Sequence, residues 1–123
     1  MNLTKNFKLS EFNSKDGVKM PSEVLENIKI LVKQLQYLRE YTDKIIYINS
    51  GYRSNSHNIK IGGSKNSQHK LGKAADIRIE DIDPKVVYEL IEYLIKDNQM
   101  LQGGLGKYKT FTHYDIRGTK ARW

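Results

Sequence analysis

The sequence lacks cysteine altogether, and no stretch of its 123 residues approaches the roughly 18 consecutive apolar residues of a membrane-spanning helix. Without cysteine there is no disulfide framework, no cysteine-based zinc finger, no iron–sulfur cluster and no cysteine nucleophile. Any metal site must therefore use His, Asp or Glu. The first residues, MNLTKNFKLSEF, also lack the apolar core of a secretory signal peptide. We expect a chain that is made in the cytoplasm and is not inserted in a membrane.

Repeats, low-complexity tracts and obvious linkers are missing too, and the length favours a single domain over residues 1–123. With 38% hydrophobic and 28% charged residues, the chain is too apolar for a disordered tail and too polar for a membrane protein. Lysine and arginine total 21 against 14 aspartates and glutamates, a net charge of +7 that favours an anionic partner. The lysines are spread over the whole chain and no nucleic-acid-binding motif is present, so we expect no nucleic-acid partner. Anionic cell-wall polymers remain a possible partner.

Hydrophobic spacing predicts two main helices and a small sheet. Residues 22–41 and 84–97 each carry apolar side chains at the i, i+3, i+4, i+7 positions of a core-facing helix. Asp83 is expected to cap the second helix, with Pro84 in its first turn. Strands are predicted at four stretches, residues 45–48, 74–79, 101–108 and 110–117. This order predicts an α+β domain in which a small mixed or antiparallel sheet packs with the two helices.

The segment 50–73 has no strong periodicity and is long for a loop in a compact domain, which is typical of functional loops. It contains His57 and His69, two of the three histidines. A catalytic zinc commonly takes three ligands from His, Asp and Glu and leaves the fourth position to water. If the strands that carry Asp76 and His113 are neighbours, these two side chains can approach one ion, with His69 coming from the loop. Spacing alone is a weak indication, because a single histidine is usually a surface or core residue.

A longer, ordered pattern strengthens this interpretation. It runs through Ser50-Gly51-Tyr52-Arg53-Ser54, Gly62-Gly63-Ser64, Ser67-Gln68-His69, Gly72, Ala74-Ala75-Asp76-Ile77 and His113-Tyr114-Asp115. The chain thereby resembles the M15-type zinc D,D-peptidases, a family of D-alanyl-D-alanine carboxypeptidases and related peptidoglycan endopeptidases. The family element SxHxxGxAxD is complete between Ser67 and Asp76, and the closing residues 117–123 are similar to the ending of small phage and bacterial members. The resemblance covers roughly residues 7–123, with the zinc site expected on one face of the sheet.

The resemblance implies that His69, Asp76 and His113 are the ligands of a zinc ion, which would activate a water for attack on an amide carbonyl. Arg53 matches the family arginine that contacts a substrate carboxylate or steadies the developing oxyanion. A planar donor that is always charged suits either task. On its own, Arg53 would be interpreted as a surface arginine in a loop.

Two further assignments keep alternatives open. Ser67 and Gln68 are expected either to bind the substrate backbone or to shape the turn into His69. Many family members carry an ionisable general base shortly before the last ligand, but the three residues before His113 are Thr, Phe and Thr. Asp115, two residues after His113 on the same strand face, is therefore the candidate catalytic residue. It acts as the base, or it orients a ligand histidine, or it only forms an ion pair with a nearby arginine.

By this resemblance the chain is a monomeric zinc metallopeptidase that hydrolyses a D-amino-acid-containing peptide of bacterial peptidoglycan, in the stem or the cross-link. The alternative is a catalytically weak or silent wall-binding or phage structural module with the same fold. The substrate lies outside the cytoplasm and no signal peptide is visible. We therefore expect action at the cell wall after phage lysis, delivery on a particle, or export by another route.

Overall fold

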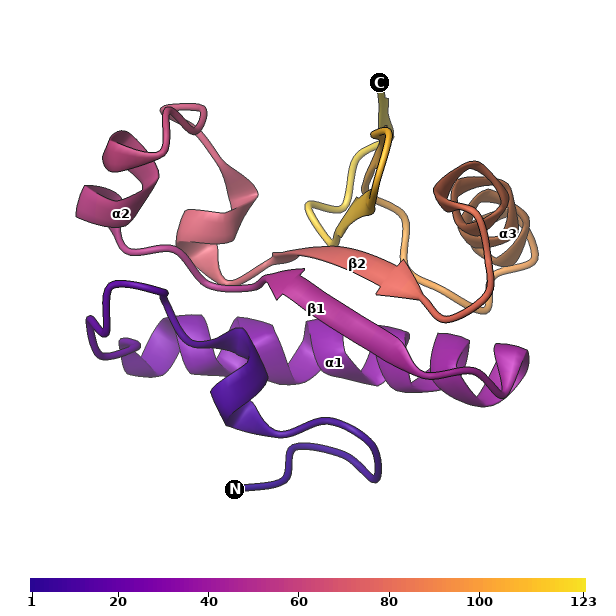
Figure 1. Cartoon of the computed structure of the whole chain (residues 1–123), viewed down its shortest axis with the longest axis horizontal. Helices are drawn as coiled ribbons and strands as arrows, with labels where there is room; N and C mark the ends of the chain where they lie inside the picture. Colours follow the sequence, from indigo (N-terminus) through magenta and orange to yellow (C-terminus); the bar gives the residue numbers. More distant parts are fainter.

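The computed structural model describes all 123 residues as an α+β fold built on a five-stranded mixed sheet (Figure 1). Its strands are β1 (Ile46–Ser50), β2 (Ala74–Ile79), β3 (Gly104–Lys107), β4 (Thr112–Asp115) and β5 (Ala121–Arg122). The strand order is β1-β2-β4-β3-β5, and every neighbouring pair is antiparallel except β3 and β5. The predicted strand 74–79 is confirmed with the same ends as β2, and the other three predicted strands are confirmed with shifted ends, whereas the short β5 was not predicted.

Three α-helices and two 3-10 turns accompany the sheet: η1 (Leu9–Phe12), α1 (Ser22–Thr42), α2 (Asn55–Lys60), η2 (Gln68–Leu71) and α3 (Pro84–Lys96). The two predicted helices are confirmed as α1 and α3. The Asp83 side chain accepts a hydrogen bond from the backbone N–H of Lys85, which is the expected cap. None of the helices is both long and apolar enough to cross a membrane.

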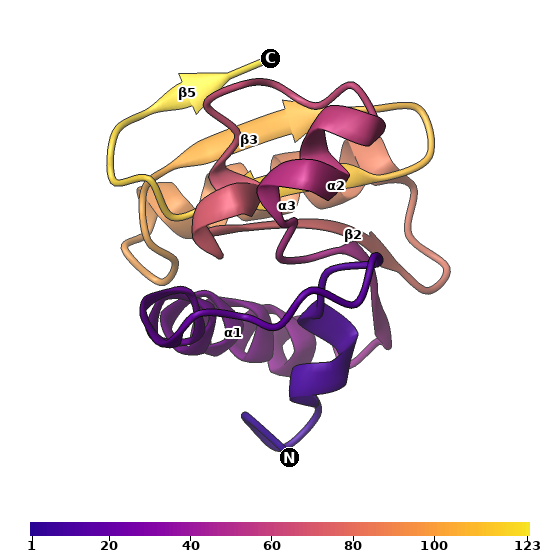
Figure 2. The same ribbon diagram turned by 90° about the vertical axis from the view of Figure 1, so that its left-hand side faces the viewer.

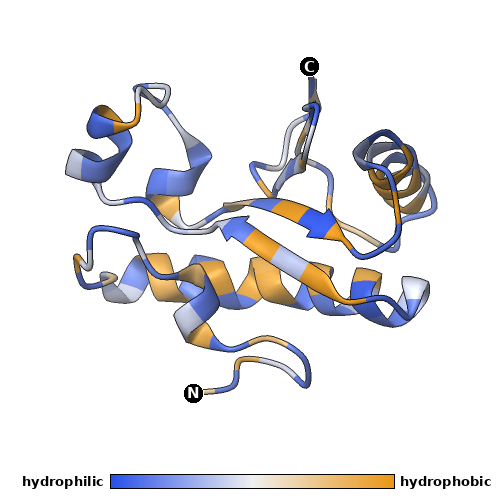
Figure 3. Ribbon diagram, in the orientation of Figure 1, coloured by the Kyte–Doolittle hydropathy of each residue, from blue (hydrophilic) through white to orange (hydrophobic).

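The helices lie on both sides of the sheet. Figures 1 and 2 show α1 along one face, with α2 and α3 on the other, at opposite ends. The apolar residues that recur along α1 (Figure 3) are buried in one hydrophobic core with residues of the sheet. Along β2, Ala75 and Ile77 belong to the hydrophobic core, so the alternating Asp76 projects to the face away from α1. The space between α2 and α3 is therefore where a polar site can form.

The segment 50–73, expected as a loop, contains α2 and η2. Both are too short to show a hydrophobic period, so side-chain caps and tertiary contacts define them instead. Ser54 caps α2 by accepting a hydrogen bond from His57 N–H, and Ser67 caps η2 by accepting one from His69 N–H. The cap of η2 fixes the backbone of His69 just before β2 begins.

The N-terminal segment buttresses the start of this region. Phe7 and Phe12 are fully buried and meet edge to face, with ring centroids 6.1 Å apart. The backbone N–H of Tyr52 donates to the Phe12 carbonyl at 2.9 Å. A Cβ on Gly51 would lie 2.7 Å from the Phe12 Cα, so only glycine allows this approach. The chain therefore enters the Arg53 region along a fixed path.

Candidate metal centre

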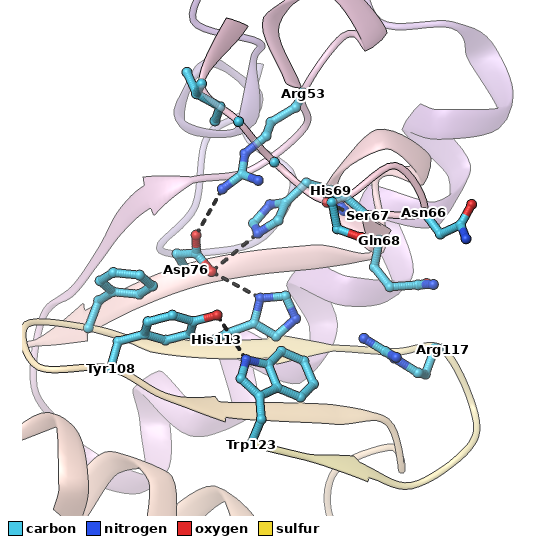
Figure 4. A pocket seen from close by; sticks show the side chains of 15 residues that line it. Arg53, Asn66, Ser67, Gln68, His69, Asp76, Tyr108, His113, Arg117 and Trp123 are labelled. Atoms are coloured by element: carbon cyan, nitrogen blue, oxygen red, sulfur yellow. Dashed lines mark hydrogen bonds and ion pairs between the residues drawn. The ribbon is translucent and has the colours of Figure 1, made fainter. Parts of the chain in front are cut away.

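Three potential metal ligands from separate parts of the chain meet on the face of the sheet opposite α1. Asp76 of β2 and His113 of β4 are directly paired in the antiparallel register, so both side chains leave the same face. His69 reaches them from η2. The Asp76 Oδ1 atom lies 3.2 Å from His69 Nε2 and 3.0 Å from His113 Nδ1 (Figure 4). The strand adjacency on which the sequence interpretation depended is confirmed.

Each histidine is held by a hydrogen bond on its other ring nitrogen. His69 Nδ1 donates to the Gly51 carbonyl at 2.8 Å, and because a carbonyl only accepts, Nε2 is left to face Asp76. His113 Nε2 lies 2.7 Å from a carboxylate oxygen of Asp115, which leaves Nδ1 to face Asp76. Such outer partners fix the ring orientation and tautomer of metal-binding histidines.

The donor set fits zinc. The ligand atoms of His69, Asp76 and His113 all lie within 4.8 Å of one another, and all three residues are buried. Donors at the usual zinc distances of about 2.0–2.2 Å in a tetrahedral arrangement lie about 3.4 Å apart, close to the two separations measured here. Three nitrogen and oxygen ligands leave a fourth position free, as in catalytic rather than structural zinc sites.

Electrostatics favour a cation at this point. Burial alone would raise the pKa of Asp76, but hydrogen bonds to His113 and His69 outweigh it and hold the pKa well below its usual range. Burial lowers the pKa of His113, while its hydrogen bonds to Asp115 and Asp76 raise it, and the net direction is upward. The cluster therefore keeps the Asp76 carboxylate ionised beside an imidazole that readily binds a proton. A metal ion can displace that proton and bind the same nitrogen.

Arg53 lies beside this group and lines the same cavity. Its guanidinium donates to Asp76 Oδ2 at 3.2 Å, to Ser50 Oγ at 3.1 Å and, at the limit of a hydrogen bond, to Asn58 Oδ1 at 3.5 Å. Its side chain is 15% exposed. Burial lowers the pKa of Arg53 and the charge of Asp76 opposes this. The guanidinium is thus fixed in place and still reaches the cavity.

Asp115 is completely buried, and its carboxylate is already saturated with donors. Oδ1 accepts from the backbone N–H of Gly104 and from Arg117, and Oδ2 accepts from Arg117 and His113. Burial raises the pKa of Asp115, but the hydrogen bonds with His113 and Arg117 outweigh it and lower the pKa. Of the roles considered for Asp115, the contacts favour orienting His113 over accepting a proton from a water in the cavity.

The metal centre forms part of a cavity of about 680 Å³ whose lining residues all come from two segments, 53–76 and 108–123. Ser67 and Gln68 are both in the wall. The Ser67 hydroxyl is engaged as the cap of η2, whereas Gln68 Oε1 is buried without a hydrogen-bond partner. Asp76 is the only acidic side chain in the lining, so no second acidic side chain is placed there as a general base.

Sequence reasoning missed Asn58 and the aromatic wall. Asn58 is buried; its amide donates to the Ser64 carbonyl at 2.8 Å while its oxygen faces Arg53. The Trp123 indole N–H donates to the Tyr108 hydroxyl at 2.8 Å, and the indole lies 4.9 Å from the His113 ring, centroid to centroid (Figure 4). A glycine-rich segment beside a polar helix is the one signal for Asn58, and it is not specific. His57, which received no role, lies outside the metal centre.

Comparison with known proteins agrees with this geometry. No curated protein matches the sequence. A family model described as Peptidase M15 matches residues 2–115. The matched range contains all three candidate ligands and Arg53, and the members of this family are zinc enzymes. Because the match spans nearly the whole sequence, the chain belongs to the peptidase M15 family.

Proposed function

We propose that this protein is a zinc-dependent peptidase that hydrolyses an amide bond in the stem or cross-link peptides of bacterial peptidoglycan. The observation that carries the proposal is the convergence of His69, Asp76 and His113 in a cavity of about 680 Å³ with Arg53 beside them. A cavity of this size accommodates a short peptide segment. Family membership supports the peptidase activity. The choice of peptidoglycan comes from the resemblance of the sequence motifs.

Zinc held by these three side chains supplies Lewis-acid activation of a carbonyl and a bound water of lowered pKa. The residues of the chain have the remaining tasks. The Arg53 guanidinium is already positioned to donate to a substrate oxygen that gains negative charge, or to a substrate carboxylate. Gln68 lies in the cavity wall with its Oε1 buried and unpaired, so a rotation of its side chain would present a polar group to the substrate backbone. Asp115 keeps His113 oriented through its second ring nitrogen.

One observation favours a second candidate function. The cavity lining offers no acidic side chain except Asp76, which is proposed as a ligand, so the usual general base of such a site is missing. A module that binds wall peptides without cutting them would have the same geometry. The two candidates differ in whether covalent bonds of the substrate are broken.

Mass spectrometry of purified peptidoglycan incubated with the zinc-loaded protein tests the proposal. A peptidase releases a defined fragment pair or a single terminal residue, and the mass change identifies the bond. His113→Ala is the matched control and should release nothing. If a protein with one zinc per chain binds peptidoglycan but leaves every mass unchanged, the peptidase proposal is wrong and the binding module replaces it.

A further inference from the structure

The excess positive charge of the chain is confined to the two segments that form the cavity. Residues 53–76 and 108–123 together carry nine lysines and arginines but only two acids, a net charge of +7. The rest of the chain carries twelve basic and twelve acidic residues, a net charge of zero. Lysines are indeed spread over the whole sequence, but acidic residues are not. The charge of +7 is therefore a property of one part of the molecule.

The two acidic residues in the cavity segments do not neutralise the lysines on the surface around the cavity. Asp76 and Asp115 are both buried and occupied by histidines and arginines of the site. The exposed acids that could pair with surface lysines lie elsewhere, and three ion pairs there are Lys29–Glu26, Arg39–Asp43 and Lys44–Asp81. The α1 side of the molecule is thus locally balanced. On the cavity side the arginines are paired, Arg53 with Asp76, Arg117 with Asp115 and Arg122 with Glu92 of α3, but no lysine of the two cavity segments forms an ion pair.

Five lysines directly follow or precede residues that line the cavity. Lys107 is turned to the Tyr88 ring of α3, with its Nζ 4.8 Å from the ring centroid, and we call the other four the basic rim: Lys60, Lys65, Lys70 and Lys109. None of them forms an ion pair with a carboxylate. Lys70 donates to the Lys65 carbonyl at 2.9 Å, which keeps these two residues of the rim together. Within the cavity, Arg53 and Arg117 lie on different sides of the metal ligands (Figure 4). Both arginines are paired with buried carboxylates, so the unpaired charge is that of the rim lysines, which together raise a positive potential at the cavity mouth.

We propose that the basic rim binds an anionic wall polymer with repeating phosphodiester groups, and so holds the cavity against the peptidoglycan to which such a polymer is attached. The exposed lysines are separate and have no common pocket, which suits a chain of repeated charges better than one small anion. This partner rests on the proposed function, since a peptide substrate embedded in the wall brings the polymer to the cavity mouth.

Direct binding to fluorescein-labelled poly(glycerol phosphate), followed by anisotropy at several salt concentrations, tests the rim without any hydrolysis. The test variant is the triple Lys60→Gln, Lys65→Gln, Lys109→Gln. The matched control is the triple Lys29→Gln, Lys33→Gln, Lys44→Gln, which removes the same charge from exposed positions on the α1 side. Zinc content and the thermal midpoint verify that both variants are folded.

The rim triple is expected to lose affinity for the polymer by about tenfold or more and to lower the salt slope by about three, whereas the control triple stays within about twofold of the wild type. Equal losses in the two triples would overturn the proposal, because net charge alone would then explain binding. Tighter binding of a single-stranded oligonucleotide of the same charge would also overturn it and assign the rim to nucleic acid. A protein that binds the polymer but cuts no peptidoglycan refutes only the peptidase function.

Discussion

Arg53 is held by three oxygen acceptors before any substrate arrives, so its guanidinium is preorganised. Arg53→Lys keeps the charge but cannot reproduce the planar two-pronged geometry. We expect kcat/KM for the released peptide to fall by about 10²-fold or more, the range for loss of an oxyanion donor, with one zinc per chain retained. Steady-state kinetics with metal analysis measures both. Near-wild-type turnover in Arg53→Lys and Arg53→Ala would leave it a structural arginine.

Asp115 is the residue for which geometry decides between sequence interpretations. In Asp115→Asn, the bond to His113 Nε2 loses its charge, and an orienting carboxylate should then weaken zinc affinity by about 10–100-fold. Activity should recover partly in excess zinc. Zinc titration followed by activity at saturating metal checks this. Full zinc binding with turnover that excess metal cannot restore would instead indicate a general base.

Asn58 joins Arg53 to the wall segment at Ser64, and a Cβ on Gly63 would lie only 2.0 Å from the Asn58 amide oxygen. Asn58→Ala removes one of the two hydrogen bonds to the Ser64 carbonyl, which keeps the bond from the Ser67 N–H at 3.1 Å, so we expect the free energy of unfolding to fall by about 1 kcal/mol. Asn58→Ala should also lower the activity of the wild-type background, because Asn58 helps to position Arg53. In the Arg53→Ala background the same substitution should lower activity much less.

A double-mutant cycle of Asn58→Ala with Arg53→Ala measures that coupling. Gly63→Ala should imitate Asn58→Ala by displacing its side chain, and Asn55→Ala, an exposed position in the same helix, is the control. Additive losses in the cycle would show that Asn58 acts independently of Arg53.

At the residue scale, the sequence was sufficient to predict that the three candidate ligands meet, but not which residues hold them in place. His69, Asp76 and His113 follow a motif whose spacing reflects a turn and two strands, so their meeting could be predicted once the strands were taken as neighbours. Asn58 and Trp123 could not be predicted, because asparagine beside a short helix and a terminal tryptophan have no periodic signature. Their contacts depend on the tertiary path of segments far apart in the sequence.

At the scale of elements, the N-terminal segment fastens α2 through one carboxylate. Asp16 accepts hydrogen bonds from the hydroxyls of Ser14, Ser54 and Ser56, and Ser54 is also the cap of α2. The bonds from Ser14 and then Ser54 hold the pKa of Asp16 well below its usual range. Ionised Asp16 therefore stabilises the folded state at neutral pH, and this contribution disappears as pH falls.

Asp16→Asn should accordingly lower the thermal midpoint at pH 7. The difference from the wild type should shrink as pH falls below about 4, where Asp16 becomes protonated in the unfolded chain, and should continue to shrink toward its lower folded-state pKa. Thermal unfolding of both proteins between pH 7 and pH 2.5 measures this. Asp97→Asn, at an exposed residue whose side chain has no hydrogen-bond partner, should show no such pH dependence. A constant difference at all pH values would exclude the linkage to Asp16.

The long elements were predictable and the short ones were not, for a physical reason. α1 and α3 each bury an apolar stripe, and that stripe is visible as a 3.6-residue period. α2 buries only one residue, the polar Asn58, and is stabilised by the Ser54 cap. Its sequence therefore has no hydrophobic pattern from which a helix could be predicted. β5 consists of Ala121–Arg122, and it forms because β3 offers a free edge and Arg122 pairs with Glu92 of α3.

At the scale of the whole molecule, the metal centre brings together η2, β2 and β4. The last two of these are separated in the sequence by α3 and β3. Zinc that binds only the folded state stabilises it by about 2.7 kcal/mol at a hundredfold excess over the dissociation constant. We expect zinc to raise the thermal midpoint of the wild type and of His57→Ala, and a chelator to reverse the rise. His69→Ala, Asp76→Ala and His113→Ala should not respond. An unchanged zinc response in His113→Ala, measured by scanning fluorimetry, would refute the ligand assignment.

The strand order has a consequence for the chain while it is being made. β2 is paired with β1 as soon as both have been synthesised, but its other edge, from Ala74 to Ile77, has no partner until β4 follows. An open strand edge is a template for pairing with other chains. A nascent chain that stops after α3 therefore leaves this edge of β2 open to pairing with other chains. β4, the strand that covers this edge, also carries His113, so the same step protects the edge of β2 and brings the third candidate ligand to the site.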